Sequence, residues 1–146
     1  MRKEQQYLDL LEKHREELSA FPIAYAFNEE QFKAALEKLG VKDKSECVTV
    51  FGHGDIVKKE NAPKFIAMLK RHTKEVKDAI VEDKELAEAA FLYEMNNHEY
   101  AINWDGDADV LACFAIDEAW VIKHGLDGAY RRARRAHMKH AQEWEM

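Results

Sequence analysis

The stretch from Asp83 to Tyr100, DKELAEAAFLYEMNNHEY, most constrains the fold, because its periodicity is helical while its apolar stripe ends in polar residues. At helical spacing the stripe contains Ala87, Ala90, Phe91, Glu94 and His98. A buried carboxylate is costly unless it meets a hydrogen-bond donor, a cation or water, or takes up a proton. We therefore predict that Glu94 and His98 face inward and that the fold supplies them with a partner.

Length and composition are those of a protein with a real core. The chain has 146 residues, of which 47% are hydrophobic, so one domain spanning residues 1–146 is expected. No apolar run reaches the length of a membrane helix, and the N-terminus MRKEQQYLDLLEKH is too charged for a secretory signal. We expect a cytoplasmic protein with no membrane partner.

The hydrophobic pattern predicts an α+β fold with about six helices and a small sheet of about three strands, antiparallel or mixed. Helical segments are expected at residues 2–19, 29–40, 62–81, 83–100, 107–114, 117–124 and 126–144. Strands are expected at residues 21–27, 47–51 and 56–59.

Local signals set several of these boundaries. Asn28 is expected to cap the helix that follows it, with Gln31 completing a capping box, and Gly40 is expected to end that helix. The sequence Gly-His-Gly-Asp at residues 52–55 provides the backbone freedom of a tight reversal, which predicts a hairpin. Pro63 favours a helix start at its first turn.

The first candidate site combines two predicted helices. The stripe of the helix at residues 62–81 is Phe65, Leu69, His72, Val76 and Ile80, so a histidine interrupts an apolar face. A short turn near Glu82 and Asp83 predicts an antiparallel pair, in which His72 and Glu94 reach the same level. With His98 they would form an open three-ligand site for zinc or another divalent metal, implying hydrolysis with Glu99 or Glu75 as base.

Two other interpretations of His72, Glu94 and His98 stay open. The three side chains can satisfy one another by hydrogen bonds, with Asn97 as a further member, and the sequence contains no HExxH signature. The second interpretation is acid-base chemistry by the same side chains without a metal. No cofactor is expected except the divalent metal that the hydrolase interpretation requires.

The second candidate site is basic. The formal net charge is -6, but residues 121–140 contain six basic residues and one acidic residue. The arginines Arg131, Arg134 and Arg135 lie at helical spacing that lets two or three guanidinium groups hold a phosphate or carboxylate. Tyr130, Trp120 and Trp144 would stack on a base if exposed.

Three roles remain possible for this basic segment. It is an ion-paired surface within the chain or across a homo-oligomer, a surface for a partner protein, or a contact for a nucleotide. The acidity of the rest of the chain argues against duplex DNA as a partner.

Other polar motifs have simpler explanations. The acids of residues 105–109 do not fit a calcium loop, because the glycine is second and residue 116 is isoleucine. His53 has no catalytic partner nearby in sequence, and hairpin formation accounts for its flanking glycines. Cys47 and Cys113 fit no CxxC spacing and are interpreted as reduced packing residues.

Three motifs resemble an uncharacterised family of small bacterial proteins associated with phages and mobile elements. They are FNEEQF at residues 27–32, the Arg71-His72 pair, and YEMNNHEY at residues 93–100, and the similarity spans residues 21–116. The resemblance implies an accessory or counter-defence protein that binds a host factor or a signalling nucleotide. It assigns no activity to Glu94 or His98.

Together these observations predict a small stoichiometric binding protein that engages a host protein or an anionic ligand such as a nucleotide. The alternative is a small metal-dependent hydrolase centred on His72, Glu94 and His98. The two hypotheses differ in whether purified protein contains near-stoichiometric metal.

Overall fold

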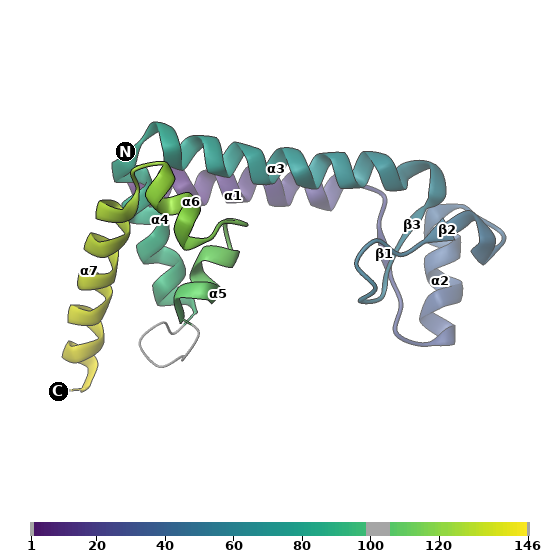
Figure 1. Ribbon diagram of the computed structural model, residues 1–146. Helices are drawn as coiled ribbons and strands as arrows, with labels where there is room; N and C mark the ends of the chain where they lie inside the picture. Colours follow the sequence, from purple (N-terminus) through teal and green to yellow (C-terminus); the bar gives the residue numbers. More distant parts are fainter. Residues whose placement is uncertain (1, 99–105, 146) are drawn as a thin grey trace. The chain divides into compact units, whose positions relative to one another are not determined.

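The structure is a computed structural model that describes residues 2–98 and 106–145, with only the helical backbone described for residues 140–145. The described residues form seven α-helices, two short 3-10 helices (Lys44–Glu46 and Lys59–Asn61) and a three-stranded antiparallel sheet (Figure 1). The predicted α+β fold class is confirmed. Within the described ranges, no helix has both the length and the apolarity needed to cross a bilayer.

The chain divides into two compact units. Unit 1 contains residues 1–12 and 73–146, and unit 2 contains residues 13–72. The boundaries fall inside helices α1 (Lys3–Ala20) and α3 (Ala62–Glu82), so each helix contributes to both units. The expectation of one domain over residues 1–146 stays a prediction.

Unit 2 contains the sheet. Strands β1 (Ala24–Tyr25), β2 (Cys47–Val48) and β3 (Asp55–Lys58) are arranged in the order β1-β3-β2. The predicted hairpin is present, since Val48 pairs with Val57 in antiparallel register. The strand expected at residues 21–27 is shorter than predicted.

Helix α2 (Glu29–Leu39) packs next to this sheet and begins and ends where local signals predicted. The Asn28 side chain accepts from the Gln31 backbone N–H at 2.8 Å, and Gly40 adopts a left-handed φ of 71°. Gln31 accepts in return from the N–H of Phe27, one residue earlier than a capping box requires. The buried apolar residues of unit 2 are Ile23, Ala24, Ala35, Leu39, Ile56, Val57, Phe65 and Met68.

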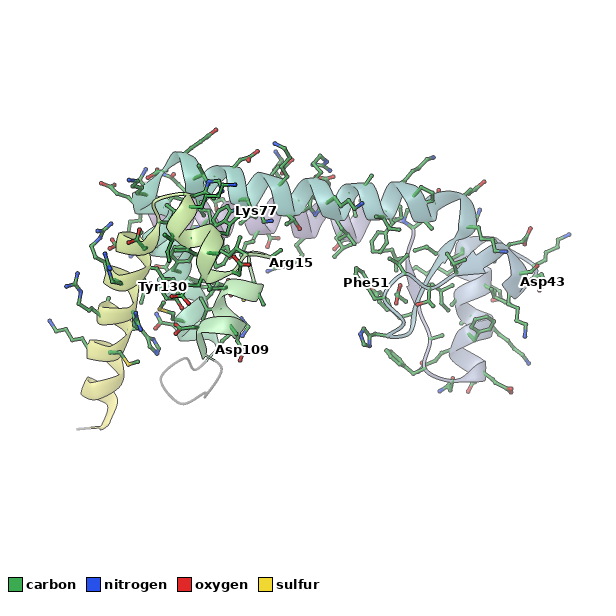
Figure 2. All side chains as sticks on the ribbon, in the orientation of Figure 1. Arg15, Asp43, Phe51, Lys77, Asp109 and Tyr130 are labelled. Carbon is green, nitrogen blue, oxygen red and sulfur yellow. The ribbon has the colours of Figure 1, made fainter. Side chains whose placement is uncertain are left out.

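The hairpin loop of unit 2 is organised by one buried carboxylate. Asp55 accepts hydrogen bonds from the backbone N–H groups of Val50, Phe51 and His53 and from the Thr49 hydroxyl. Phe51, labelled in Figure 2, packs its ring edge-on against Phe65 at a centroid distance of 5.8 Å. The glycines and the aspartate of residues 52–55 therefore act as a structural turn, as predicted.

Unit 1 is helical. Helix α4 (Lys84–Asn97) packs along α7 (Asp127–Glu145), with α5 (Gly106–Ala112) and α6 (Glu118–Lys123) completing the unit. Asp83 caps α4 by accepting from the backbone N–H groups of Glu85 and Leu86, and it also pairs with Lys3 at 2.6 Å. The largest side chains that are almost fully enclosed in this unit are Ile80, Phe91, Met95, Val110, Phe114 and Leu126.

Candidate functional site

The polar end of the α4 stripe forms a cluster around Glu94, which is 6% exposed. The predicted burial of Glu94 is confirmed. One of its carboxylate oxygens, Oε1, accepts a hydrogen bond from the Tyr7 hydroxyl at 2.9 Å. The other, Oε2, lies 3.2 Å from Nε2 of His98, one helical turn further along α4. Two partners therefore stabilise the buried carboxylate.

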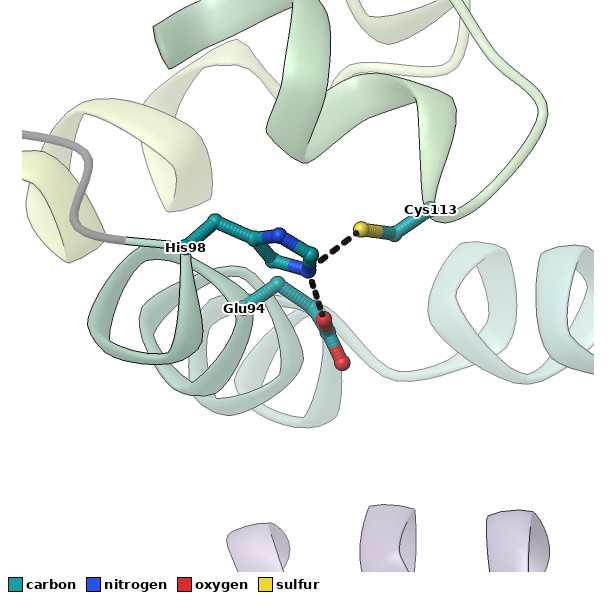
Figure 3. A group of neighbouring side chains, drawn as sticks. All are labelled: Glu94, His98 and Cys113. Carbon is teal, nitrogen blue, oxygen red and sulfur yellow. Dashed lines mark hydrogen bonds and ion pairs between the residues drawn. The ribbon is translucent and has the colours of Figure 1, made fainter. Parts of the chain in front are cut away.

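His98 lies at the end of α4, and its side chain is 40% exposed, so the prediction that it faces inward is wrong. The helix ends at Asn97, so His98 is the residue that follows it and lies at the solvent-exposed edge of the cluster. Its Nε2 also lies 3.2 Å from Sγ of Cys113, which follows α5 directly. Figure 3 shows that the contacts to Glu94 and Cys113 end on the same ring nitrogen.

This geometry separates two kinds of chemistry. In a catalytic triad of a nucleophile, a histidine and a carboxylate, the carboxylate accepts a hydrogen bond from one ring nitrogen of the histidine. The nucleophile is hydrogen-bonded to the other ring nitrogen. Here Glu94 and Cys113 share Nε2 of His98, so the ring cannot relay a proton between them. Instead, one nitrogen, one oxygen and one sulfur atom converge, all within 4.8 Å of one another. Convergent N, O and S donors are typical of a site for a transition metal.

The surroundings keep the Cys113 thiol and the Tyr7 hydroxyl protonated at neutral pH. Burial of the thiol and the neighbouring Glu94 carboxylate raise the pKa of Cys113 to about 12. Burial and the same carboxylate also raise the pKa of Tyr7 above its ordinary value. A thiol with such a pKa is a poor nucleophile at neutral pH. Cys113 is therefore not an activated catalytic cysteine on its own.

His72 does not join this cluster, contrary to prediction. It belongs to unit 2, where its ring stacks on His14 at a centroid distance of 4.0 Å and its Nε2 lies 3.4 Å from a carboxylate oxygen of Glu17. The prediction assumed that the helices on either side of Asp83 pack as an antiparallel pair. Helix α4 instead packs along α7, so the assumed matching of levels does not apply.

The remaining predicted members also differ from expectation. Asn97 is exposed, and its neighbour Asn96 makes the side-chain contact instead, with Oδ1 2.6 Å from Nδ1 of buried His137. Glu99 lies outside the described residues. Glu75 belongs to α3 in unit 1 and makes none of the contacts described for the cluster.

The predicted basic residues lie together on α7. Arg131, Arg134 and Arg135 line one surface depression with Arg132 and Gly128, and none of the described acidic residues lines it. We call these four arginines the arginine face. A Cβ at Gly128 would lie 3.3 Å from Nη1 of Arg132, so the end of the Arg132 side chain would have to shift by a few tenths of an ångström.

Two members of the arginine face have acidic partners within unit 1. Arg132 donates to Glu88 of α4 at 2.7 Å, and Arg131 lies 3.4 Å from Asp127. For Arg134 and Arg135, the described part of the chain shows no ion pair. The face therefore combines two ion-paired guanidinium groups with two that make no ion pair within the described residues, of which Arg134 also lines a neighbouring depression with Asp107, Glu118 and Asp127.

Aromatic stacking on a base is not supported. Tyr130, labelled in Figure 2, is 8% exposed and donates its hydroxyl hydrogen to Asp107 at 2.5 Å. The guanidinium of Arg134 lies 6.0 Å from the centre of the Tyr130 ring. Trp120 packs on His124 at 4.3 Å. The Trp144 side chain lies outside the described residues.

Sequence reasoning missed Cys113 and Tyr7. The spacing of Glu94 and His98 already signals one helical face, but Cys113 follows His98 by 15 residues, with α5 in between. Tyr7 is 3% exposed and fits the apolar stripe of the first helix, so only its hydroxyl reveals the second role.

Comparison with known proteins gives one match. The sequence profile of a family described as a family of unknown function (DUF7659) matches residues 6–131. No curated protein and no solved structure matches the chain. The match covers Tyr7, Glu94, His98 and Cys113, and it ends at Arg131, before Arg134 and Arg135.

Proposed function

The chain belongs to this family of unknown function over residues 6–131, and we propose from its own residues that it is a stoichiometric binding protein whose arginine face captures an anionic group. The group is a phosphate or carboxylate carried by a host protein or by a small ligand such as a nucleotide. The observation that carries the proposal is the depression on α7 whose lining, among the described residues, consists of Gly128 and four arginines.

The geometry supports recognition rather than catalysis at this surface. Guanidinium groups bind planar oxyanions in a bidentate manner, and two neighbouring arginines fix the orientation of the anion. Glu88 holds Arg132 at 2.7 Å, so part of the face is ordered before a ligand arrives. Preorganised donors lose less conformational entropy on binding.

The charge distribution supports an anionic ligand. Residues 121–140 carry six of the 22 basic residues and one of the 28 acidic residues, while the chain as a whole has a net charge of -6. A local positive surface on an acidic protein attracts anions over short distances and repels extended polyanions. Duplex DNA is therefore not among the proposed partners.

A charge-reversal experiment tests the proposal. Arg131→Glu/Arg135→Glu is compared with wild type for binding of fluorescent ATP, pyrophosphate as a competitor, and a labelled acidic peptide. We expect at least one probe to bind and the double variant to lose more than tenfold in affinity, since each charge-assisted hydrogen bond contributes about 1.5–3 kcal/mol. Co-purification from the native host with mass analysis would identify the physiological ligand.

The matched control is Lys33→Glu/Lys38→Glu on α2, which changes the net charge equally at exposed positions of unit 2. It should bind as wild type does. Equal losses in both double variants would mean that only overall charge matters, and the arginine face would then be abandoned as the binding surface.

The wider setting is part of the same proposal. The resemblance to phage and mobile-element proteins supports an accessory or counter-defence role in the cytoplasm, which the protein would carry out as a single chain or as a homo-oligomer. The hydrolase built on His72, Glu94 and His98 is not proposed, because His72 contacts Glu17 and His14 instead.

A further inference from the structure

The cluster at the end of α4 is separate from the arginine face, and we propose that Glu94, His98 and Cys113 form a zinc-binding site with an open fourth position. The ligand atoms are Oε2 of Glu94, Nε2 of His98 and Sγ of Cys113. They come from α4, from the residue that ends it, and from the residue after α5 (Figure 3).

The spacing of the donor atoms fits a tetrahedral ion. From ordinary zinc bond lengths, ligand nitrogen and oxygen atoms lie about 3.3 Å apart, and nitrogen and sulfur atoms about 3.6 Å apart. The observed separations from Nε2 of His98 are 3.2 Å to Glu94 and 3.2 Å to Cys113. The third pair, Oε2 of Glu94 and Sγ of Cys113, lies within 4.8 Å, so a shift of these side chains would bring it to the roughly 3.6 Å of a tetrahedral ion.

Tyr7 would fix the orientation of the Glu94 ligand. Its hydroxyl holds Oε1 of Glu94 at 2.9 Å, which fixes the carboxylate and leaves Oε2 facing His98. Hydrogen bonds of this kind orient metal ligands and commonly change metal affinity by about 10–100-fold. The carboxylate is thus preorganised before any metal arrives.

The donor set selects the metal. A thiolate and an imidazole disfavour Mg²⁺ and Ca²⁺, which prefer oxygen ligands. One nitrogen, one oxygen and one sulfur match zinc, which also binds open sites with three protein ligands and a water. His98 and Cys113 are both exposed, so an ion can enter from solvent. On binding, the thiol of Cys113 gives its proton to solvent.

The hydrogen-bonded network alone does not require Cys113 at this place. Glu94 already has Tyr7 and His98, and the thiol of Cys113 contacts the Asp109 carbonyl at 3.4 Å. A cysteine that fills space would not need its sulfur 3.2 Å from the same ring nitrogen that faces the carboxylate. A hydrogen-bonded thiol and a metal-ligating thiolate share this convergence, and metal titration distinguishes the two.

Cobalt substitution tests the site on the full-length protein after chelator treatment. Titration with Co²⁺ should saturate at one equivalent and produce an intense near-ultraviolet thiolate-to-cobalt band together with visible bands of four-coordinate cobalt, and Zn²⁺ should displace it. Cys113→Ser should abolish the thiolate band. The matched control Cys47→Ser makes the same chemical change at the second cysteine, in unit 2, and should keep the band.

Two further variants keep the test decisive if a core substitution unfolds the protein. His98→Gln changes an exposed side chain and should weaken Co²⁺ binding more than about 100-fold, while Tyr7→Phe should weaken it by about 10-fold. The proposal is overturned if folded wild-type protein gives no thiolate band at one equivalent, or if Cys113→Ser retains it. Metal binding that none of these variants changes would be adventitious and would also overturn it.

Discussion

The Tyr7 hydroxyl donates a 2.9 Å hydrogen bond to Glu94, although 87 positions separate the two residues in the chain. Tyr7 is 3% exposed and Glu94 is 6% exposed, so the bond joins two buried groups of unit 1. Hydrogen bonds to a charged group are stronger than neutral ones, and leaving the buried partner unpaired is costly. This contact explains how α4 can bury a carboxylate at the end of an apolar stripe.

Removing the Tyr7 hydroxyl should therefore destabilise the protein. Tyr7→Phe keeps the ring, which packs at 5.9 Å from Phe114, but leaves Oε1 of Glu94 without its donor. We expect the free energy of unfolding to fall by about 1–3 kcal/mol, measured by urea denaturation. Tyr25→Phe is the control, because Tyr25 is 57% exposed and should change the value by less than about 0.5 kcal/mol.

A double-mutant cycle with Glu94→Gln isolates the contact. If Tyr7 acts through Glu94, the two changes should couple by about 0.5–3 kcal/mol. Additive losses would mean that the Tyr7 hydroxyl stabilises something other than this carboxylate.

Local signals predicted the helix ends well, because capping depends on residues that are close in sequence. Asn28 and Gly40 cap the two ends of α2 as predicted. Asp83 caps the start of α4 by accepting hydrogen bonds from the backbone N–H groups of Glu85 and Leu86. The hairpin between β2 and β3 follows the same logic. In these places the chain needs no distant partner to select the conformation.

The candidate site depended on packing that periodicity cannot predict. The burial of Glu94 follows from its stripe, but its partners follow from which elements lie beside α4. The apolar face of α4 meets α7, so counting residues outward from Asp83 paired Glu94 with the wrong histidine. Cys113 and Tyr7 reach the cluster only through the tertiary fold.

Lowering the pH should reduce the stability of unit 2, because Asp55 then takes up a proton. Burial alone would raise the pKa of Asp55, but the backbone N–H groups of Phe51 and Val50, the Thr49 hydroxyl and the His53 N–H lower it from 3.8 to about 2. A lowered folded-state pKa stabilises the fold above the ordinary pKa, and this stability is lost as the pH falls from about 4 towards 2. The contribution is about 2 kcal/mol at neutral pH.

Asp55→Asn should remove most of this pH dependence and lower the free energy of unfolding at pH 7. Denaturation curves between neutral pH and the acid limb would show a shallower loss in the variant than in wild type. Asp78→Asn serves as the control, since the pair that the described residues give Asp78 is an exposed one with Lys74, and the variant should leave the acid limb unchanged. An unchanged limb in Asp55→Asn would contradict the assignment.

Two glycines of the same hairpin loop should respond differently to alanine. Both have a left-handed φ, +77° at Gly52 and +85° at Gly54, so each substitution strains the backbone by about 1 kcal/mol. At Gly54 a Cβ would also lie 2.7 Å from Cε1 of Phe27 and 3.0 Å from the carbonyl oxygen of Ala26. At Gly52, an added Cβ would have no described atom within 4 Å outside the chain neighbours of the glycine.

The exposed Phe27 ring can rotate away from a new methyl group, but the Ala26 carbonyl cannot, because the Ala26 N–H is bonded to the Gly54 carbonyl at 2.9 Å. Gly54→Ala should therefore destabilise the protein by at least about 1 kcal/mol more than Gly52→Ala, in parallel urea denaturations. Equal losses would show that backbone strain alone accounts for both positions. A larger loss at Gly52 would mean that the loop does not approach Ala26 as described.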